Sequence, residues 1–165
     1  MKIKTIVLMI AVAALLVAPA VSAQDAVSSA SQVVDEDSLL NAVSDDGEWI
    51  VIIQEDISTD QDLVLEGEKE NRGEVARKVA LYDQDDDRNI TDRYTLEAPS
   101  ITVKSPKTAF YAGTFIGDVY VESEDFSLTS EVTVEGNIYF ENEAAKESFT
   151  IDGGATVTGD LVNNW

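Results

Sequence analysis

Apolar and polar side chains alternate in three short segments that each begin with glycine. The segments are Gly117-Asp-Val-Tyr-Val, Gly136-Asn-Ile-Tyr-Phe and Gly159-Asp-Leu-Val-Asn. Alternation at a period of two residues is typical of strands that have one buried face. The segments recur at steps of 19 and 23 residues. A repeat of about 20 residues predicts a solenoid in which each copy forms one rung.

The repeat also predicts which side chains stack, because neighbouring rungs lie about 4.8 Å apart. Phe126 and Phe149 each lie ten residues before a glycine of the repeat, so we expect their rings to stack. Replacing Phe149 by alanine should then cost about 3–5 kcal/mol. The same alignment predicts an inward column of Val119, Ile138 and Leu161, two outward columns of Thr114, Thr133 and Thr156 and of Tyr120, Tyr139 and Val162, and a corner column of Asp118, Asn137 and Asp160.

A stack of such rungs is a parallel β-helix. A leucine-rich repeat has a similar period, but it requires a leucine-rich pattern with Asn or Cys that this chain lacks. A β-sandwich whose strands are similar by accident is the alternative. We therefore predict an all-β chain that forms a single-stranded parallel β-helix of about five to six coils.

Residues 1–23 have the three parts of a secretory signal peptide. Two lysines precede an apolar run from Ile6 to Val17, and Val21-Ser-Ala23 offers a cleavage site before Gln24. A membrane anchor is the alternative, but the run is short for a membrane span and Pro19 interrupts it. We predict an extracytoplasmic protein, which is secreted, periplasmic or at the cell surface, without an integral membrane anchor after cleavage.

The mature chain is predicted to form one domain behind a short leader. Residues 24–36 are small, polar and acidic, so we expect them to be flexible. Residues 37–46 place apolar side chains on one helical face, and Asp37 or Ser38 can cap this helix. The helix would cover the open N-terminal end of a β-helix domain that spans residues 37–165.

Two polar segments interrupt the strands in the first half of this domain, at residues 67–77 and 83–93. Excursions on a solenoid tend to gather on one side. We therefore expect these two to touch, with Arg72 and Arg77 near the acidic residues of the second segment. At the other end of the domain, either Trp165 folds over the core as a lid or the end stays open and pairs with another subunit.

The charge of the chain restricts its partners. The sequence has 32 acidic and 11 basic residues, for a net charge of -21, and loss of residues 1–23 with their two lysines would make it -23. Nucleic acids and anionic membranes would be repelled, whereas metal cations and basic proteins are compatible. Solubility alone would also explain the charge. The sequence contains neither Cys nor His, which excludes disulfides, the common zinc sites and triads that need these residues.

One acidic run has the oxygen spacing of the first half of an EF-hand loop. Oxygen-bearing side chains stand at alternate positions from Asp83 to Asn89, but Arg88 stands where an EF-hand needs glycine. The hypothesis is an irregular calcium site, because calcium accepts six to eight oxygens in flexible geometry. Its ligands would be Asp83, Asp85, Asp86, Asp87 and Asn89. A solvated loop neutralised by arginines, among them Arg88 and Arg93, is the alternative.

Several segments resemble pectin-lyase-like right-handed parallel β-helix proteins. Ser38-Leu-Leu-Asn-Ala-Val followed by Asp46-Gly-Glu-Trp-Ile-Val carries this likeness. Gly47-Glu-Trp-Ile-Val, Leu63-Val-Leu-Glu-Gly-Glu, Ala80-Leu-Tyr-Asp-Gln-Asp and Gly117-Asp-Val-Tyr-Val are similar to segments of a group of small exported bacterial proteins. The likeness covers about residues 38–160 and concerns architecture, so it implies a right-handed coil and no particular activity.

These observations favour an exported, non-catalytic structural or interaction module over an enzyme. Such a module could assemble with itself or attach to another surface protein, with calcium bridging the acidic faces. The alternative is a carbohydrate-binding module or a minimal calcium-dependent polysaccharide lyase. Tyr120 and Tyr139 are the candidate contacts with a partner or a glycan, and Arg88 or Arg93 would lie beside the calcium ion of a lyase.

Overall fold

The computed structural model describes residues 30–165 as an all-β chain whose two larger sheets are built from parallel strands. The first, sheet A, has six strands in the order β1, β2, β7, β11, β13 and β16. Their bounds are Ala30–Val33, Ile50–Ile53, Arg77–Ala80, Thr108–Tyr111, Ser127–Thr129 and Thr150–Ile151. The predicted signal peptide at residues 1–23, like the first part of the predicted leader, lies outside the described residues.

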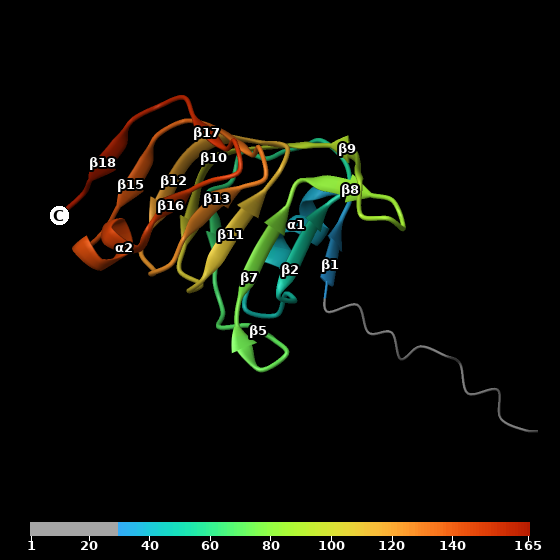
Figure 1. Ribbon diagram of the computed structural model, residues 1–165, viewed down its shortest axis with the longest axis horizontal. Coiled ribbons are helices and arrows are strands. Elements are labelled where there is room, and N and C mark those ends of the chain that lie inside the picture. The colour runs from blue at the N-terminus through green and yellow to red at the C-terminus, as the bar shows by residue number, and fades with distance from the viewer. Residues whose placement is uncertain (1–29) are drawn as a thin grey trace, which may run out of the picture.

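The second, sheet B, has eight strands. The long strands β10 (Thr95–Val103) and β12 (Thr114–Val121) run across its whole width. Shorter strands form its other rungs in pairs: β3 (Ile57–Ser58) with β4 (Leu63–Leu65), β14 (Thr133–Glu135) with β15 (Ile138–Phe140), and β17 (Thr156–Val157) with β18 (Leu161–Asn163). Figure 1 shows the strands arranged along one elongated stack, with β1 near one end and β18 at the other.

The register of sheet B confirms the predicted alignment of the repeat. Val119 pairs with Ile138, and Ile138 pairs with Leu161. The threonine and tyrosine columns follow in the same register. Thr95 pairs with Thr114 and so extends the threonine column by one rung.

The three glycines of the repeat lie directly over one another within sheet B, inside β12 at Gly117 and between the paired short strands at Gly136 and Gly159. A Cβ atom added to Gly136 would lie 2.0 Å from the carbonyl oxygen of Gly117, and one added to Gly159 would lie 2.3 Å from that of Gly136. Real Cβ atoms do not approach so closely, so each position requires a residue without a side chain. This close backbone approach explains why glycine recurs at the start of each segment.

The hydrophobic core lies between the two sheets. The ring of Phe110 on β11 of sheet A meets the ring of Phe115 on β12 of sheet B, with centroids 6.1 Å apart. Phe126 is fully buried and packs against Phe110 at 5.1 Å. Phe149 stacks on Phe126 at 5.6 Å and an interplanar angle of 20°, which confirms the predicted pair.

Helix α1 (Glu36–Val43) buries its apolar face in the core next to β1, so a short helix leading into the strands is confirmed. The predicted bounds of 37–46 and the caps at Asp37 or Ser38 are wrong. Asp35 caps the helix, because its Oδ1 accepts the backbone N–H of Ser38 at 2.8 Å while the Oγ of Ser38 accepts the backbone N–H of Asp35 at 3.1 Å. Each residue of this reciprocal box satisfies a donor that the helix leaves free.

The predicted flexible leader is wrong for the part that the structure describes. Ala30–Val33 forms β1, which pairs in parallel with β2, and Val33 is fully buried. The small and polar composition of this segment hid the strand, because only one of its four side chains enters the core. The domain therefore begins before residue 37.

Two antiparallel hairpins project from the stack at the predicted polar excursions. One joins β5 (Glu70–Asn71) to β6 (Glu74–Val75), and the other joins β8 (Tyr82–Gln84) to β9 (Ile90–Arg93). The prediction that they touch is wrong, because β5 and the β8–β9 hairpin lie well apart in Figure 1. Helix α2 (Glu143–Ser148) lies directly before Phe149, in the longer of the two steps of the repeat.

Candidate functional site

The predicted calcium ligands occupy the β8–β9 hairpin, where two of them already accept hydrogen bonds from the protein. The hydroxyl of Tyr94 donates to Oδ2 of Asp83 at 2.9 Å and raises the pKa of Tyr94 to about 12. The side chain of Asn89 donates to Oδ2 of Asp85 at 3.0 Å, and its backbone N–H donates to Oδ1 at 2.8 Å. These donors lower the pKa of Asp85.

The hairpin does not gather its carboxylates around one point. Asp86 and Asp87 are exposed at its turn. Nowhere in the part of the chain that the structure describes do three or more acidic side chains come together in a group that could hold a metal ion. Calcium binding by this hairpin therefore stays a prediction.

The two arginines of this hairpin bond to different parts of the chain. Arg88 adopts a left-handed backbone conformation with φ of 67°, and its N–H donates to the carbonyl oxygen of Asp85 at 2.9 Å. Arg93 forms an ion pair with Glu131 at 2.6 Å, outside the hairpin. Both members of this pair are well exposed, so it contributes at most about 1 kcal/mol to stability.

Tyr120 and Tyr139 stack on the outer face of sheet B. Their ring centroids are 4.8 Å apart and their planes differ by 12°. Both rings are half-buried, and Nδ2 of Asn137 donates to the Tyr139 hydroxyl at 3.2 Å. Aliphatic side chains or threonine occupy the other rungs of this column, which reads Val64, Thr102, Tyr120, Tyr139 and Val162.

Two polar columns flank the tyrosines. The first is the predicted corner column with two additions, and reads Asp62, Ser100, Asp118, Asn137 and Asp160. Hydrogen bonds link its rungs: the N–H of Asn137 donates to Asp118 at 2.9 Å, and the N–H of Asp160 donates to Asn137 at 2.9 Å. Each residue of the second column lies two positions after a member of the tyrosine column in the sequence. This column reads Glu66, Lys104, Glu122, Glu141 and Asn164. We call these three columns together the tyrosine face.

A hollow of about 160 Å³ lies on the outer face of sheet A, beside β8. Its lining includes Ile50, Ile52 and Ala80 as an apolar floor. Lys78 bounds it, with Nζ donating to the Tyr82 hydroxyl at 2.7 Å and lying 4.1 Å from the ring centroid of Tyr111. This hollow was not predicted from the sequence. The available signal was that β2 has apolar residues at outward as well as inward positions.

The C-terminal end of the stack exposes side chains of a kind that earlier rungs bury. Leu128 and Ile138 are fully buried, whereas their partners on the last rung, Ile151 and Leu161, are 44% and 49% exposed. Trp165 is 56% exposed. The lid formed by Trp165 is therefore wrong, and the end is open in the part of the chain that the structure describes.

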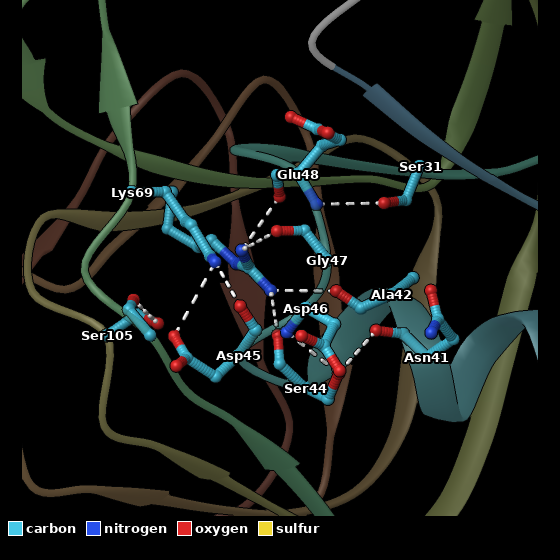
Figure 2. A network of polar contacts seen from close by, with 12 residues as sticks. Ser31, Asn41, Ala42, Ser44, Asp45, Asp46, Gly47, Glu48, Lys69 and Ser105 are labelled. Atoms are coloured by element: carbon cyan, nitrogen blue, oxygen red, sulfur yellow. Dashed lines mark hydrogen bonds and ion pairs between the residues drawn. The ribbon is translucent and has the colours of Figure 1, made fainter.

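Arg77 is 1% exposed and holds the turn after helix α1. Nη1 donates to the carbonyl oxygens of Glu48 at 2.7 Å and Gly47 at 3.4 Å, and Nη2 to those of Ala42 at 2.7 Å and Ser44 at 3.3 Å. Figure 2 shows these carbonyl groups converging from the helix end and the following loop. The predicted position of Arg77 beside the acidic hairpin is wrong.

The Arg77 network is structural. Helix α1 has no basic residue in its last turn, and Arg77 brings a positive charge to that end, where the helix dipole favours one. Burial lowers the pKa of the guanidinium, while the nearby carboxylates of Asp45 and Glu48 oppose this shift. The hydrogen bonds of Nη1 and Nη2 all go to backbone oxygens, whereas the buried Nε has no hydrogen-bond partner among the described residues.

Comparisons of this chain with family models, with curated proteins and with solved structures find no match. Among residues 30–165, no helix has the length and apolar character that crossing a membrane requires.

Proposed function

We propose that this chain is an exported right-handed parallel β-helix that serves as a non-catalytic structural module and assembles with a second copy through its C-terminal end. The parallel register and the column of glycines support the coil. The half-exposed Ile151 and Leu161, which continue columns that are otherwise buried, are the observation that carries the assembly.

The two ends of the stack differ, and the difference favours a closed pair over a filament. Helix α1 covers the N-terminal end and buries Leu39, Ala42 and Val43 there. An open end cannot stack on this covered end, so the open ends of two copies would meet each other. Such a contact is isologous and closes with two-fold symmetry.

The open end offers both backbone and side-chain interactions to the second copy. β16, β17 and β18 are each the last strand of their ladder, so their outer backbone groups have no strand partner within residues 30–165. Completing the burial of Ile151, Leu161 and Trp165 in both copies would contribute about 6 kcal/mol, at about 1 kcal/mol for each half-exposed side chain. The cost of association is of similar size, so we expect a dimer that depends on protein concentration.

Sedimentation velocity on residues 24–165 over a range of concentrations tests this proposal. The wild-type chain should shift from monomer to dimer as its concentration rises. The double variant Ile151→Gln/Leu161→Gln should stay monomeric. Ile90→Gln is the matched control, because Ile90 is also exposed, at 38%, but lies on the β8–β9 hairpin. A wild-type chain that is monomeric throughout, or a double variant that dimerises like the control, would refute the assembly.

The same sedimentation measurement, repeated with calcium and with a chelator, tests whether calcium causes a second mode of association. If calcium bridges acidic faces, its addition should raise the mass beyond that of the dimer, a chelator should reverse the change, and Asp85→Asn/Asp87→Asn should abolish it. Assembly through the open end should instead be the same in calcium and in chelator. The two modes of association are therefore distinguishable.

A further inference from the structure

The tyrosine face combines an aromatic stack with an excess of negative charge. Six carboxylates belong to its two outer columns, against one lysine: Asp62, Glu66, Asp118, Glu122, Glu141 and Asp160, with Lys104. The neighbouring half of sheet B carries the threonine column instead, with Glu97 and Glu135 beside it. Aromatic rings and carboxylates therefore coincide on one half of the outer face of the sheet.

None of these carboxylates forms an ion pair with a cation of the described chain. The ion pairs found within residues 30–165 are Lys69 with Asp45 and Arg93 with Glu131, and neither involves the tyrosine face. Asp118 accepts hydrogen bonds from Asn137, but these donors are neutral and leave its charge in place. The pKa of Tyr120 is raised by burial first, then by Tyr139 and the charge of Asp118, as expected for a ring in a negative field.

The spacing of this face suits a guanidinium group. Alternate residues of an extended chain lie about 6.6–6.8 Å apart, so Tyr120 stands between Asp118 on β12 and Glu122, which directly follows β12. An arginine that packs against the tyrosine would have a carboxylate within reach on either side. Arginine stacks on aromatic rings and bonds carboxylates through two donors, whereas the lysine ammonium is a strongly hydrated point charge.

We propose that the tyrosine face binds an arginine-rich segment of a partner protein. An acidic glycan would be repelled by the six carboxylates, and a neutral sugar could accept no more than hydrogen bonding from them because it brings no positive charge to balance theirs. A basic segment gains from both features of the face. The proposal is independent of dimer formation, because the open end and the tyrosine face are different surfaces.

Fluorescence anisotropy with two labelled peptides tests the proposal on residues 24–165. One peptide alternates arginine with glycine, and the other alternates lysine with glycine at the same length and charge. The arginine peptide should bind more tightly, and its affinity should fall as salt is raised. Tyr120→Leu/Tyr139→Leu should weaken the arginine peptide about fivefold and the lysine peptide much less.

Matched variants separate this site from general attraction to an acidic protein. Glu122→Gln/Glu141→Gln should weaken both peptides, whereas Glu97→Gln/Glu135→Gln, with the same change in charge, should have a smaller effect. Tyr120→Phe/Tyr139→Phe keeps the rings and should bind as wild type, which assigns a loss in the leucine variant to the aromatic rings and not to the hydroxyl groups.

Three outcomes would overturn the proposal. The first is equal binding of both peptides that the tyrosine substitutions leave unchanged. The second is an equal loss from the two pairs of glutamate substitutions, because binding would then follow net charge alone. The third is that the wild-type chain binds neither peptide but binds a neutral glycan, and that the leucine variant does not bind this glycan. That result would favour a carbohydrate-binding module.

Discussion

The buried guanidinium of Arg77 gives a sharp prediction about stability. Arg77→Met keeps most of the volume of the side chain and removes its charge and its donors. The carbonyl groups of Ala42, Ser44, Gly47 and Glu48 then lose the hydrogen bonds that join helix α1 to the following loop. We expect a large loss of stability that begins at this end of the molecule.

The size of the expected loss in the free energy of unfolding depends on how deeply each carbonyl group is buried. Ala42 and Gly47 are buried, whereas Ser44 is half-buried and Glu48 is exposed, so water can replace only part of the lost bonding. Each oxygen left buried without a donor costs about 1–3 kcal/mol. Relief of the buried charge offsets part of this cost, because burial already disfavours the charged form of Arg77. The net loss should be about 3 kcal/mol for Arg77→Met, and about 2 kcal/mol for Arg77→Lys, which keeps the charge but loses the fork of donors.

Urea denaturation followed by tryptophan fluorescence measures this loss. The chain has two tryptophans, and Trp165→Phe leaves Trp49, which follows Glu48 directly, as a reporter near the network. Far-UV circular dichroism on the same samples reports the strands. If Arg77 mainly holds the end of α1, the Trp49 signal of Arg77→Met should change at lower urea than the dichroism does.

Arg72→Met is the matched control, because Arg72 is exposed on the β5–β6 hairpin. Its effect should stay within about 0.5 kcal/mol. A loss below about 1 kcal/mol for Arg77→Met, or a gain, would show that the buried charge costs as much as its hydrogen bonds contribute. In that case the network would not be what fixes helix α1 over the core.

Three further predictions concern other parts of the stack. Gly136→Ala should destabilise the domain by about 3 kcal/mol in thermal or chemical denaturation, because its Cβ would strike the carbonyl oxygen of Gly117. Phe149→Ala should cost about 2 kcal/mol, less than the full value for a buried phenylalanine, because Phe149 is only half-buried. Ultraviolet titration should show Tyr94 ionising near pH 12, and Asp83→Asn should lower this pKa because it removes the charge that accepts the tyrosine hydrogen bond. The protonated tyrosine therefore contributes to stability below its ordinary pKa of 10.0, and this contribution is lost as pH rises through about 12.

The register of the C-terminal half could be predicted from the sequence because each rung repeats its predecessor. When side chains alternate at a period of two and the repeat length is known, aligning one pair of residues aligns all the others. The columns that contain Val119, Thr114 and Tyr120 were therefore predictable. The glycines were informative for the same reason, since a close backbone approach recurs at the same place in each rung.

The N-terminal half was less predictable because its contacts join segments that do not repeat. β1 forms a strand because it pairs with β2. Only one of its own residues, Val33, is buried, so its sequence carries little sign of a strand. Arg77 was assigned to an acidic loop on the basis of charge. It stands in line with Val79 at an inward position of β7, and alternation along the strand would have indicated a buried arginine.

The same contrast separates the two candidate sites. The calcium hypothesis depended on how a turn folds, and there the side chains of Asp83 and Asp85 satisfy local donors from Tyr94 and Asn89. The tyrosine face depends only on the register, which places an outward side chain over its equivalent in the next rung. A function that uses such a face needs no special loop, because adding or removing a rung lengthens or shortens the binding surface while leaving its chemistry unchanged. Outward columns are therefore where the sequence of a stacked parallel sheet bears most directly on binding, and stacked Tyr120 and Tyr139 form the aromatic part of one.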